Sequence, residues 1–449
     1  MRLLYSTQNL KMEDILRKPI AILLPLMILC FACSDDETID DDNPLNNPPG
    51  EFLSSNLEAL GSIDLEAFQV PDSYEITGAF APGAYNGQIR RIAQLQEIVD
   101  STRNEPIFWD IANAIEVGGL SDVFQSPAAQ NTATSSSDIR SKIDELNFDN
   151  GDTSVADAFA DLADRLVTSS QANFTVTASN GVAGMITSGD KKRHVSANGL
   201  EFAQILEKGL FGPLFYDQTV DDYLRPTQAG AENASGNNEA AVDNYSSNGT
   251  DRQHRFDEAF GYFGANPDTY PNPANTSTGD GSFIANYTFD FSDETEAAFG
   301  INLAQGAMDA FIIGRAALKA GEGFGPSDES TNEAVYDAAR ADIKLYMEAG
   351  LATAAFHYLN NAIADITDED KIHHISEALG FIYSLQFNSE GRISPTEVHN
   401  TLIALGWPIS DATLDGIYDI NLWDITDAQL EEARSILENS FPGFSDVPF

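Results

Sequence analysis

The chain has 449 residues, of which 24 are Lys or Arg and 70 are Asp or Glu, so its formal net charge at pH 7 is −46. Such an acidic protein repels phosphate backbones, which excludes nucleic acid as a partner. The two cysteines, Cys30 and Cys33, both lie near the N-terminus, so the rest of the chain has neither a disulfide nor a thiolate site. Its stability must come from a hydrophobic core.

The first 32 residues have the pattern of a secretory signal peptide. Arg17-Lys18 precedes an apolar run, Pro19 to Ala32, that is too short to span a bilayer comfortably. Cys33 follows directly, preceded by the small side chain that a lipoprotein cleavage site needs. We therefore expect cleavage before Cys33 and lipid attachment to it, with translation starting at Met1 or Met12. The alternative is an uncleaved membrane anchor.

Residues 33–51 are rich in Asp, Asn and Pro and have too little apolar surface to fold, so we expect an acidic disordered tether. Acidic runs directly after the lipidated cysteine resemble the surface-export signal of Bacteroidota lipoproteins; a plain spacer is the alternative. The expected location is the outer membrane. The lipid on Cys33 would hold the domain there, on the cell surface or on the periplasmic face.

Residues 52–449 are predicted to form a single, all-α domain after a short irregular lead-in from Phe52 to about Gln88. Beyond it, apolar residues recur at helical spacing. The predicted helices are 89–99, 107–117, 139–146, 155–166, 197–224 with a break at Gly212-Pro213, 254–263, 294–320, 332–364, 368–387, 395–405 and 427–438. Thr367 and Thr426 are expected helix caps. Long polar or turn-rich loops are expected at 228–250 and 264–290.

Two of these helices repeat one another. Residues 254–263 align without gaps with residues 373–382, and they share the pattern His-x3-Glu-Ala-[Phe/Leu]-Gly-aromatic. A spacing of 119 residues is too long for a solenoid unit. We therefore expect one duplication that gives a helical bundle of two related halves.

Each copy carries half of a possible metal site. Residues three and four apart share a helix face, so His254 lies over Asp257 and Glu258. In the second copy, His373 and His374 lie over Glu377. If the two copies meet across a pseudo-twofold axis, two His and two Glu converge, a ligand set that suits zinc or iron. Gly261 and Gly380 would let a neighbouring helix approach closely.

Simpler interpretations remain open for these residues. A His followed four residues later by Glu is a common helix-surface pair, and a buried structural His–Glu hydrogen bond is equally consistent with the pattern. Polar residues on the 197–224 helix, Glu201, Gln204 and Lys208, are expected on a solvated face, with a pocket lining as the alternative. No nucleophile motif or phosphate-binding loop is present, so an enzyme is the less favoured interpretation.

Four segments resemble a known family: Asn86-Gly87-Gln88-x-x-Arg91, Asn198 to Leu210, the His254 helix and the His374 helix. They are similar to the Bacteroidota lipoproteins of domain of unknown function 4856, which implies no established activity. The resemblance covers the chain from about Tyr74. A more distant likeness is to imelysin-like proteins, duplicated helical bundles linked to iron uptake. Their Gly-x-His-x-x-Glu motif is matched by His374-x-x-Glu377, although its glycine is absent from both copies.

Together these features predict a membrane-anchored lipoprotein that binds a metal cation, iron or zinc, or a small ligand between two helical halves. The residues expected to bind it are His254, Glu258, His373, Glu377, Asp257 and His374. The alternative is a metal-free interaction lipoprotein that contacts an outer-membrane partner such as a transporter.

Overall fold

Helices make up most of the described structure, as the recurrence of apolar residues predicts. The computed structural model describes residues 50–61, 68, 70–71, 73–74, 85–103, 105–119, 122–132, 137–143, 154–224, 251–267, 281–320, 331–407 and 414–448. The predicted signal peptide, Cys33, nearly all of the predicted tether and the polar insert at 228–250 lie outside the described residues. The described residues belong to one compact unit.

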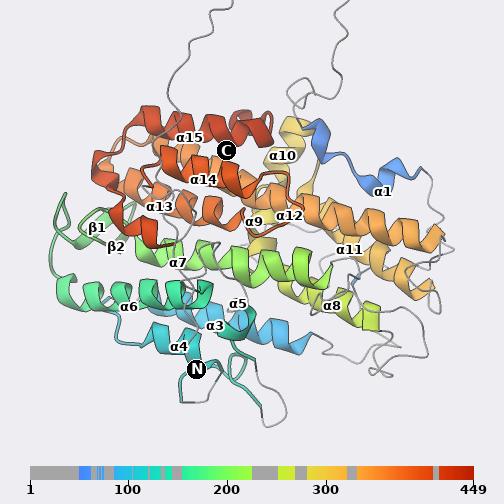
Figure 1. Cartoon of the computed structure of the whole chain (residues 1–449), viewed down its shortest axis with the longest axis horizontal. Coiled ribbons are helices and arrows are strands. Elements are labelled where there is room, and N and C mark those ends of the chain that lie inside the picture. The colour runs from blue at the N-terminus through green and yellow to red at the C-terminus, as the bar shows by residue number, and fades with distance from the viewer. Residues whose placement is uncertain are drawn as a thin grey trace, which may run out of the picture. The chain divides into compact units, whose positions relative to one another are not determined.

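The elements are labelled in Figure 1. Those before the insert are α1 (Asn56–Ala59), α3 (Asn86–Thr102), α4 (Ile111–Val117), α5 (Arg140–Ile143), α6 (Val155–Asn173), β1 (Gly184–Ser188), β2 (Lys191–Val195) and α7 (Phe202–Leu210). Two π-helical segments, Phe211–Tyr216 and Gln218–Tyr223, continue α7. Those after the insert are α8 (Asp251–Phe263), α9 (Ile284–Asp290), α10 (Ser292–Phe299), α11 (Leu303–Ala320), α12 (Thr331–Ala364), α13 (Asp368–Ser384), α14 (Pro395–Ala404) and α15 (Asp427–Ser440).

The middle of the unit is formed by α7 and its π-helical continuation (Figure 1). Helices α3 and α6 pack on α7 from one side and α13 packs on it from the other. Phe211, Leu214 and Phe215 on the continuation are completely buried. The longest helix, α12, packs along α11 and α13. This layering makes α7 and α13 the pair of helices that holds the site described below.

The predicted break at Gly212-Pro213 is wrong, because the chain stays helical there with wider turns. Pro213 has no N–H to donate to the residue four positions earlier, and a π-helical turn accommodates that loss. The N–H of Gly212 donates to Ser384 Oγ at 2.9 Å. A Cβ on Gly212 would lie 2.7 Å from Ser384 Cα, so the glycine permits the close approach of α13.

Helical periodicity does not predict the β1–β2 hairpin. The strands pair antiparallel with Ser188 opposite Lys191, which leaves Gly189-Asp190 as a two-residue turn. Gly189 has a φ of 60°, the left-handed conformation that such a turn requires. The Gly-Asp pair, a typical two-residue hairpin turn, is therefore the signal in the sequence that indicates this hairpin.

Several helix ends are shifted by a few residues from the prediction, and three elements differ in kind. The expected irregular lead-in contains α1. The expected loop at 264–290 is described only at residues 264–267 and 281–290, and it ends in α9. The predicted helix 294–320 is two helices, α10 and α11, bent by 102° where Gly300 adopts a φ of 72°. Thr367 and Thr426 cap α13 and α15 through their side chains, as predicted. No single helix in the described ranges is long and apolar enough to cross a membrane, although the α10–α11 pair reaches that length and composition together.

The residues that follow the predicted tether are fastened to α12 by one carboxylate. Asp342, which is 1 % exposed, accepts hydrogen bonds from the Ser55 hydroxyl at 2.7 Å, from the Asn56 backbone at 2.6 Å and from the Leu57 backbone at 3.0 Å. Two of these donors are backbone N–H groups in the first turn of α1, which has no internal partner for them. Asp342 therefore anchors the start of the folded region to the core.

Candidate functional site

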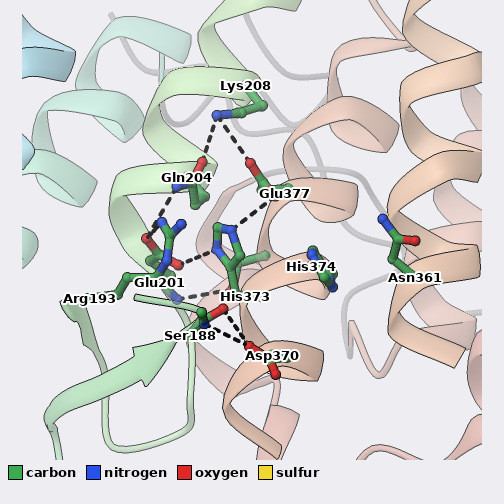
Figure 2. Close-up of polar contacts among 12 residues, drawn as sticks. Ser188, Arg193, Glu201, Gln204, Lys208, Asn361, Asp370, His373, His374 and Glu377 are labelled. Carbon is green, nitrogen blue, oxygen red and sulfur yellow. Dashed lines mark hydrogen bonds and ion pairs between the residues drawn. The ribbon is translucent and has the colours of Figure 1, made fainter. Parts of the chain in front are cut away.

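His373 lies between two carboxylates (Figure 2). Its Nδ1 is 2.8 Å from Oε2 of Glu201, which precedes the first turn of α7, and its Nε2 is 3.3 Å from Oε2 of Glu377, one turn further along α13. The three residues are exposed by 7 %, 3 % and 6 %, respectively. Two acidic groups are therefore held on one imidazole in the interior of the protein, where charges must be compensated.

Two basic side chains extend this cluster (Figure 2). Lys208 Nζ lies 3.5 Å from Glu377 Oε1, 2.8 Å from Glu207 Oε2 and 2.6 Å from Gln204 Oε1. Arg193 on β2 donates to Glu201 Oε1 at 3.1 Å. Burial alone disfavours the charged ammonium, but Glu207 and Glu377 raise the pKa of Lys208 above its ordinary value. The Glu–His–Glu group is therefore part of a buried network of paired charges.

The pKa of Glu201 shows that its polar contacts outweigh its burial. Burial raises its pKa, but the hydrogen bond from His373 and the positive charges of His373 and Arg193 outweigh burial and lower the pKa below the ordinary value. Glu201 is therefore an anion at neutral pH. Arg193 on β2 and His373 on α13 both contact Glu201, which therefore connects the hairpin, α7 and α13.

Gly380 allows α7 and α13 to come close enough for this network. A Cβ there would lie 2.5 Å from Lys208 Cβ and 3.1 Å from the Gly209 nitrogen. Gly261 has the same role in the first copy, where a Cβ would lie 2.7 Å from Tyr85 Cβ and 2.9 Å from Gln88 Cβ at the start of α3. The expectation that both glycines permit a close helix approach is confirmed.

We predict that Gly380→Ala lowers the free energy of unfolding by about 1–3 kcal/mol, because the new methyl group must push the two helices apart. Denaturant unfolding followed by circular dichroism measures this. Gly87→Ala is the matched control, since a Cβ on Gly87 in α3 meets its nearest atoms at an ordinary 3.4 Å. Equal stability of the two variants would contradict the predicted clash.

His374 faces a different neighbour. Its Nδ1 is 2.7 Å from Asp365 Oδ2, at the end of α12, and Figure 2 places it on the side of His373 where Asn361 lies. Even so, one ligand atom from each of His373, His374 and Glu377 lies within 4.8 Å of the others. Among the described residues, this is the group of three His, Asp, Glu or Cys side chains close enough to hold one metal ion.

The first copy makes a separate cluster. His254 Nε2 lies 3.5 Å from Glu258 Oε2, and Glu258 also accepts from Gln88 at 3.1 Å and from Arg255 at 2.8 Å. Its helix, α8, packs on α3 and α11, whereas α13 packs on α7 and α12. Within the described part of the chain, the two His–Glu pairs therefore do not gather into one group of ligand atoms.

Asp257 is turned into the core instead. Its Oδ1 lies 2.8 Å from Arg315 Nε on α11 and accepts from the Tyr74 hydroxyl at 2.6 Å. Asp257 is 1 % exposed, and burial raises its pKa despite the neighbouring guanidinium. The side chain that we expected beside His254 is thus the centre of a buried ion pair.

The expected solvated face on the 197–224 helix is wrong for Glu201 and Lys208. Both are at least nine-tenths buried, because α13 covers them and supplies His373 and Glu377 as partners. Glu201, Gln204 and Lys208 are spaced by three and four residues, so they form one stripe along α7. This stripe lies among the buried apolar residues of α7, and that position was the signal of a buried polar contact.

The stripe lines a cavity of about 700 Å³. Its walls come from the end of α3, from β2, from α7, from α9 and from α13. The lining residues are Val99, Thr102, Arg103, Glu105, Lys191, Lys192, Arg193, His194, Glu201, Ala203, Gln204, Glu207, Lys208, Tyr287 and Glu377. Because Glu201 and Glu377 form part of this wall, the cavity leads to the two carboxylates that flank His373.

A family model described as Domain of unknown function (DUF4856) matches residues 78–440. The chain belongs to this family. No curated protein and no solved structure matches it. The matched region contains both His–Glu helices, α7 and the cavity wall, so the network around His373 lies within the part of the chain that defines a DUF4856 protein.

The contacts of His373 limit the chemical states of this DUF4856 site. A neutral imidazole donates one hydrogen bond and presents a lone pair at its other nitrogen. With a carboxylate oxygen at each nitrogen, that lone pair would face a negative charge. The Nδ1 hydrogen bond to Glu201 is therefore made by an N–H donor, and Nε2 faces Glu377 Oε2 at 3.3 Å, a place where a proton or a metal cation between the two atoms is stabilised.

Proposed function

We propose that the protein is a lipoprotein, anchored in the outer membrane through Cys33, whose helical domain binds a divalent transition-metal cation at His373, His374 and Glu377. The observation that supports this is the orientation of the two imidazoles. Each has its Nδ1 on a carboxylate, Glu201 for His373 and Asp365 for His374. A carboxylate at one nitrogen fixes the tautomer and leaves Nε2 for the metal, which is the usual arrangement of metal-binding histidines.

The ligand types indicate which metals fit. Two imidazoles and one carboxylate suit zinc or iron, and three protein ligands leave a position open for water or a small ligand. Glu377 has one oxygen for this purpose, because Oε1 faces Lys208 and Oε2 faces His373. Ligand atoms of one such ion are about 3.3 Å apart when the bonds are 2.0–2.1 Å long. His373 Nε2 and Glu377 Oε2 already have this separation, at 3.3 Å, and the ligand atoms of all three residues lie within 4.8 Å of one another, so binding needs only a small approach of the side chains.

The test is the metal content of the full-length protein, purified in detergent and incubated with Zn²⁺ or Fe²⁺. We expect about one equivalent of metal in the wild type and a loss of at least tenfold in affinity for His373→Ala. His254→Ala is the matched control: His254 is also 7 % exposed and also has a glutamate one turn later, yet it lies outside the cluster. Elemental analysis should find that this control still binds metal.

Glu377→Gln provides a second variant that keeps the shape of the side chain while it removes the anionic ligand. Thermal unfolding of each variant shows whether the fold is retained. A wild type that takes up neither metal overturns the proposal, as does a His373→Ala variant that folds and keeps its metal. Either outcome would favour the alternative function, a metal-free lipoprotein that contacts an outer-membrane partner.

A further inference from the structure

Positive charge collects at one wall of the cavity. Lys191-Lys192-Arg193 is the only run of three basic residues in a chain with a net charge of −46. All three lie on β2 and line the cavity, together with Arg103 and Lys208. Five of the 24 Lys and Arg residues thus surround one cavity. The net charge of the chain does not explain why five basic residues gather at one cavity, because acidic residues that could pair with them are found throughout the sequence.

The acidic residues of the same cavity are already satisfied. Glu201, Glu207 and Glu377 are paired with Arg193 and Lys208. Glu105 accepts a hydrogen bond from the Ser170 hydroxyl, and burial raises its pKa above the ordinary value although that hydrogen bond acts in the other direction. Lys191 and Lys192, in contrast, are exposed and have no ion-pair partner among the described residues. The cavity is lined by five basic side chains and four acidic ones, so the formal charge of its lining is +1, and the two lysines without an ion-pair partner lie on β2.

The wall next to these lysines also has unused hydrogen-bonding groups. The Nδ1 of His194 and the Nε of Arg193 are buried and have no hydrogen-bond partner within the described ranges. His194 is 3 % exposed, and burial lowers its pKa to about 4, so its ring is neutral at pH 7 and one of its nitrogens carries a proton. Buried polar groups normally have partners, and Arg Nε is a donor. Arg193 and His194 both line the cavity, so a molecule with acceptor oxygens bound there lies next to these unpaired groups.

We propose that the cavity binds a small organic anion whose carboxylate or phosphate oxygens contact Lys191, Lys192 and the Arg193–His194 wall. A volume of about 700 Å³ is that of a small-molecule site, not of a docking surface for a protein. The polar side chains of Gln204 and Glu207, which also line the cavity, would contact the uncharged polar part of such a molecule. This inference does not depend on the metal proposed above.

The experiment measures anion binding to the full-length protein in detergent, after chelator treatment has removed any metal, by isothermal titration calorimetry with citrate and with inorganic phosphate. We expect saturable binding of at least one probe, and the preferred probe distinguishes a carboxylate ligand from a phosphate ligand. The double variant Lys191→Glu, Lys192→Glu should bind it at least about tenfold more weakly, because two attractive charges become repulsive. Both lysines are exposed, so the fold is retained.

The control Arg165→Glu, Lys319→Glu changes the net charge by the same amount at residues that do not line the cavity. It should bind the anion as the wild type does. Absence of binding to the wild type with both probes overturns the proposal. Equal weakening by the control also overturns it, because the effect would then come from the net charge of the protein and not from this cavity. Since the protein is metal-free in every arm, failure of the metal proposal has no influence on the result.

Discussion

Asp257→Ala is expected to lower the free energy of unfolding by about 3–5 kcal/mol, the largest loss that we predict for one substitution. Arg315 is 9 % exposed, and the variant leaves its guanidinium without the carboxylate that lies 2.8 Å from its Nε. It also removes the acceptor of the Tyr74 hydroxyl, whose ring stacks on Phe260 with 3.7 Å between ring centroids. Urea unfolding followed by circular dichroism measures the loss.

A double-mutant cycle separates the ion pair from ordinary packing. Replacing Asp257 and Arg315 together by leucine should cost less than the sum of the two single replacements, because no buried charge is then left without a counter-charge. Glu258→Ala, on the same helix but 14 % exposed at its side chain, should cost less than Asp257→Ala. A cost below about 1 kcal/mol for Asp257→Ala would show that the pair does not support the core.

The different fates of Asp257 and Glu258 show where periodicity stops being informative. Both acids lie on the helix face below His254, as their spacing predicts. Asp257 is the one that enters the core, because it forms an ion pair with Arg315 on α11. Glu258 lies instead over α3, where Gln88 donates to it. The helix face was predictable from the sequence, but the partner helix was not.

Close helix approaches were predictable for a different reason. A glycine inside a helix costs conformational entropy, so Gly261 and Gly380 at equivalent positions indicate that something needs the space. The glutamate partners of His373 were only half predictable: Glu377 is one turn away, whereas Glu201 lies 172 residues earlier in the chain. No local pattern connects residues so far apart, and only the packing of α13 on α7 brings them together.

The two copies repeat one packing arrangement with different chemistry. In each, the helix with His and Glu is packed through its glycine on an earlier helix, α3 for α8 and α7 for α13. The residue of the earlier helix that contacts the glutamate is neutral Gln88 in the first copy and charged Lys208 in the second. The parallel supports the predicted duplication. Because the contact residue of the second copy is charged, the network of charges around His373 forms there.

Glu348 on α12 should make stability depend on pH near neutrality. The side chain is 3 % exposed, and burial raises its pKa to about 7, although the backbone N–H groups of Arg392 and Ile393 and the charge of Arg392 act in the other direction. The folded protein thus holds a proton that the unfolded chain releases near pH 4.5. The contribution of Glu348 to stability is fully present below about pH 4.5 and is lost as the pH rises through 7.

A shift from 4.5 to about 7 corresponds to about 3 kcal/mol of unfolding free energy, which the wild type should lose between pH 4.5 and pH 8 through this one group. Glu348→Gln stays neutral and keeps an oxygen that accepts from the Ile393 N–H, which now lies 3.1 Å from Oε1. We therefore expect the variant to match the wild type near pH 5 and to be more stable by about 2–3 kcal/mol at pH 8. Glu431→Gln, at an exposed position on α15, should leave the pH profile of unfolding unchanged. If Glu348→Gln and the wild type lose stability equally between pH 5 and pH 8, the proton is not held by Glu348, and other groups must account for any pH dependence.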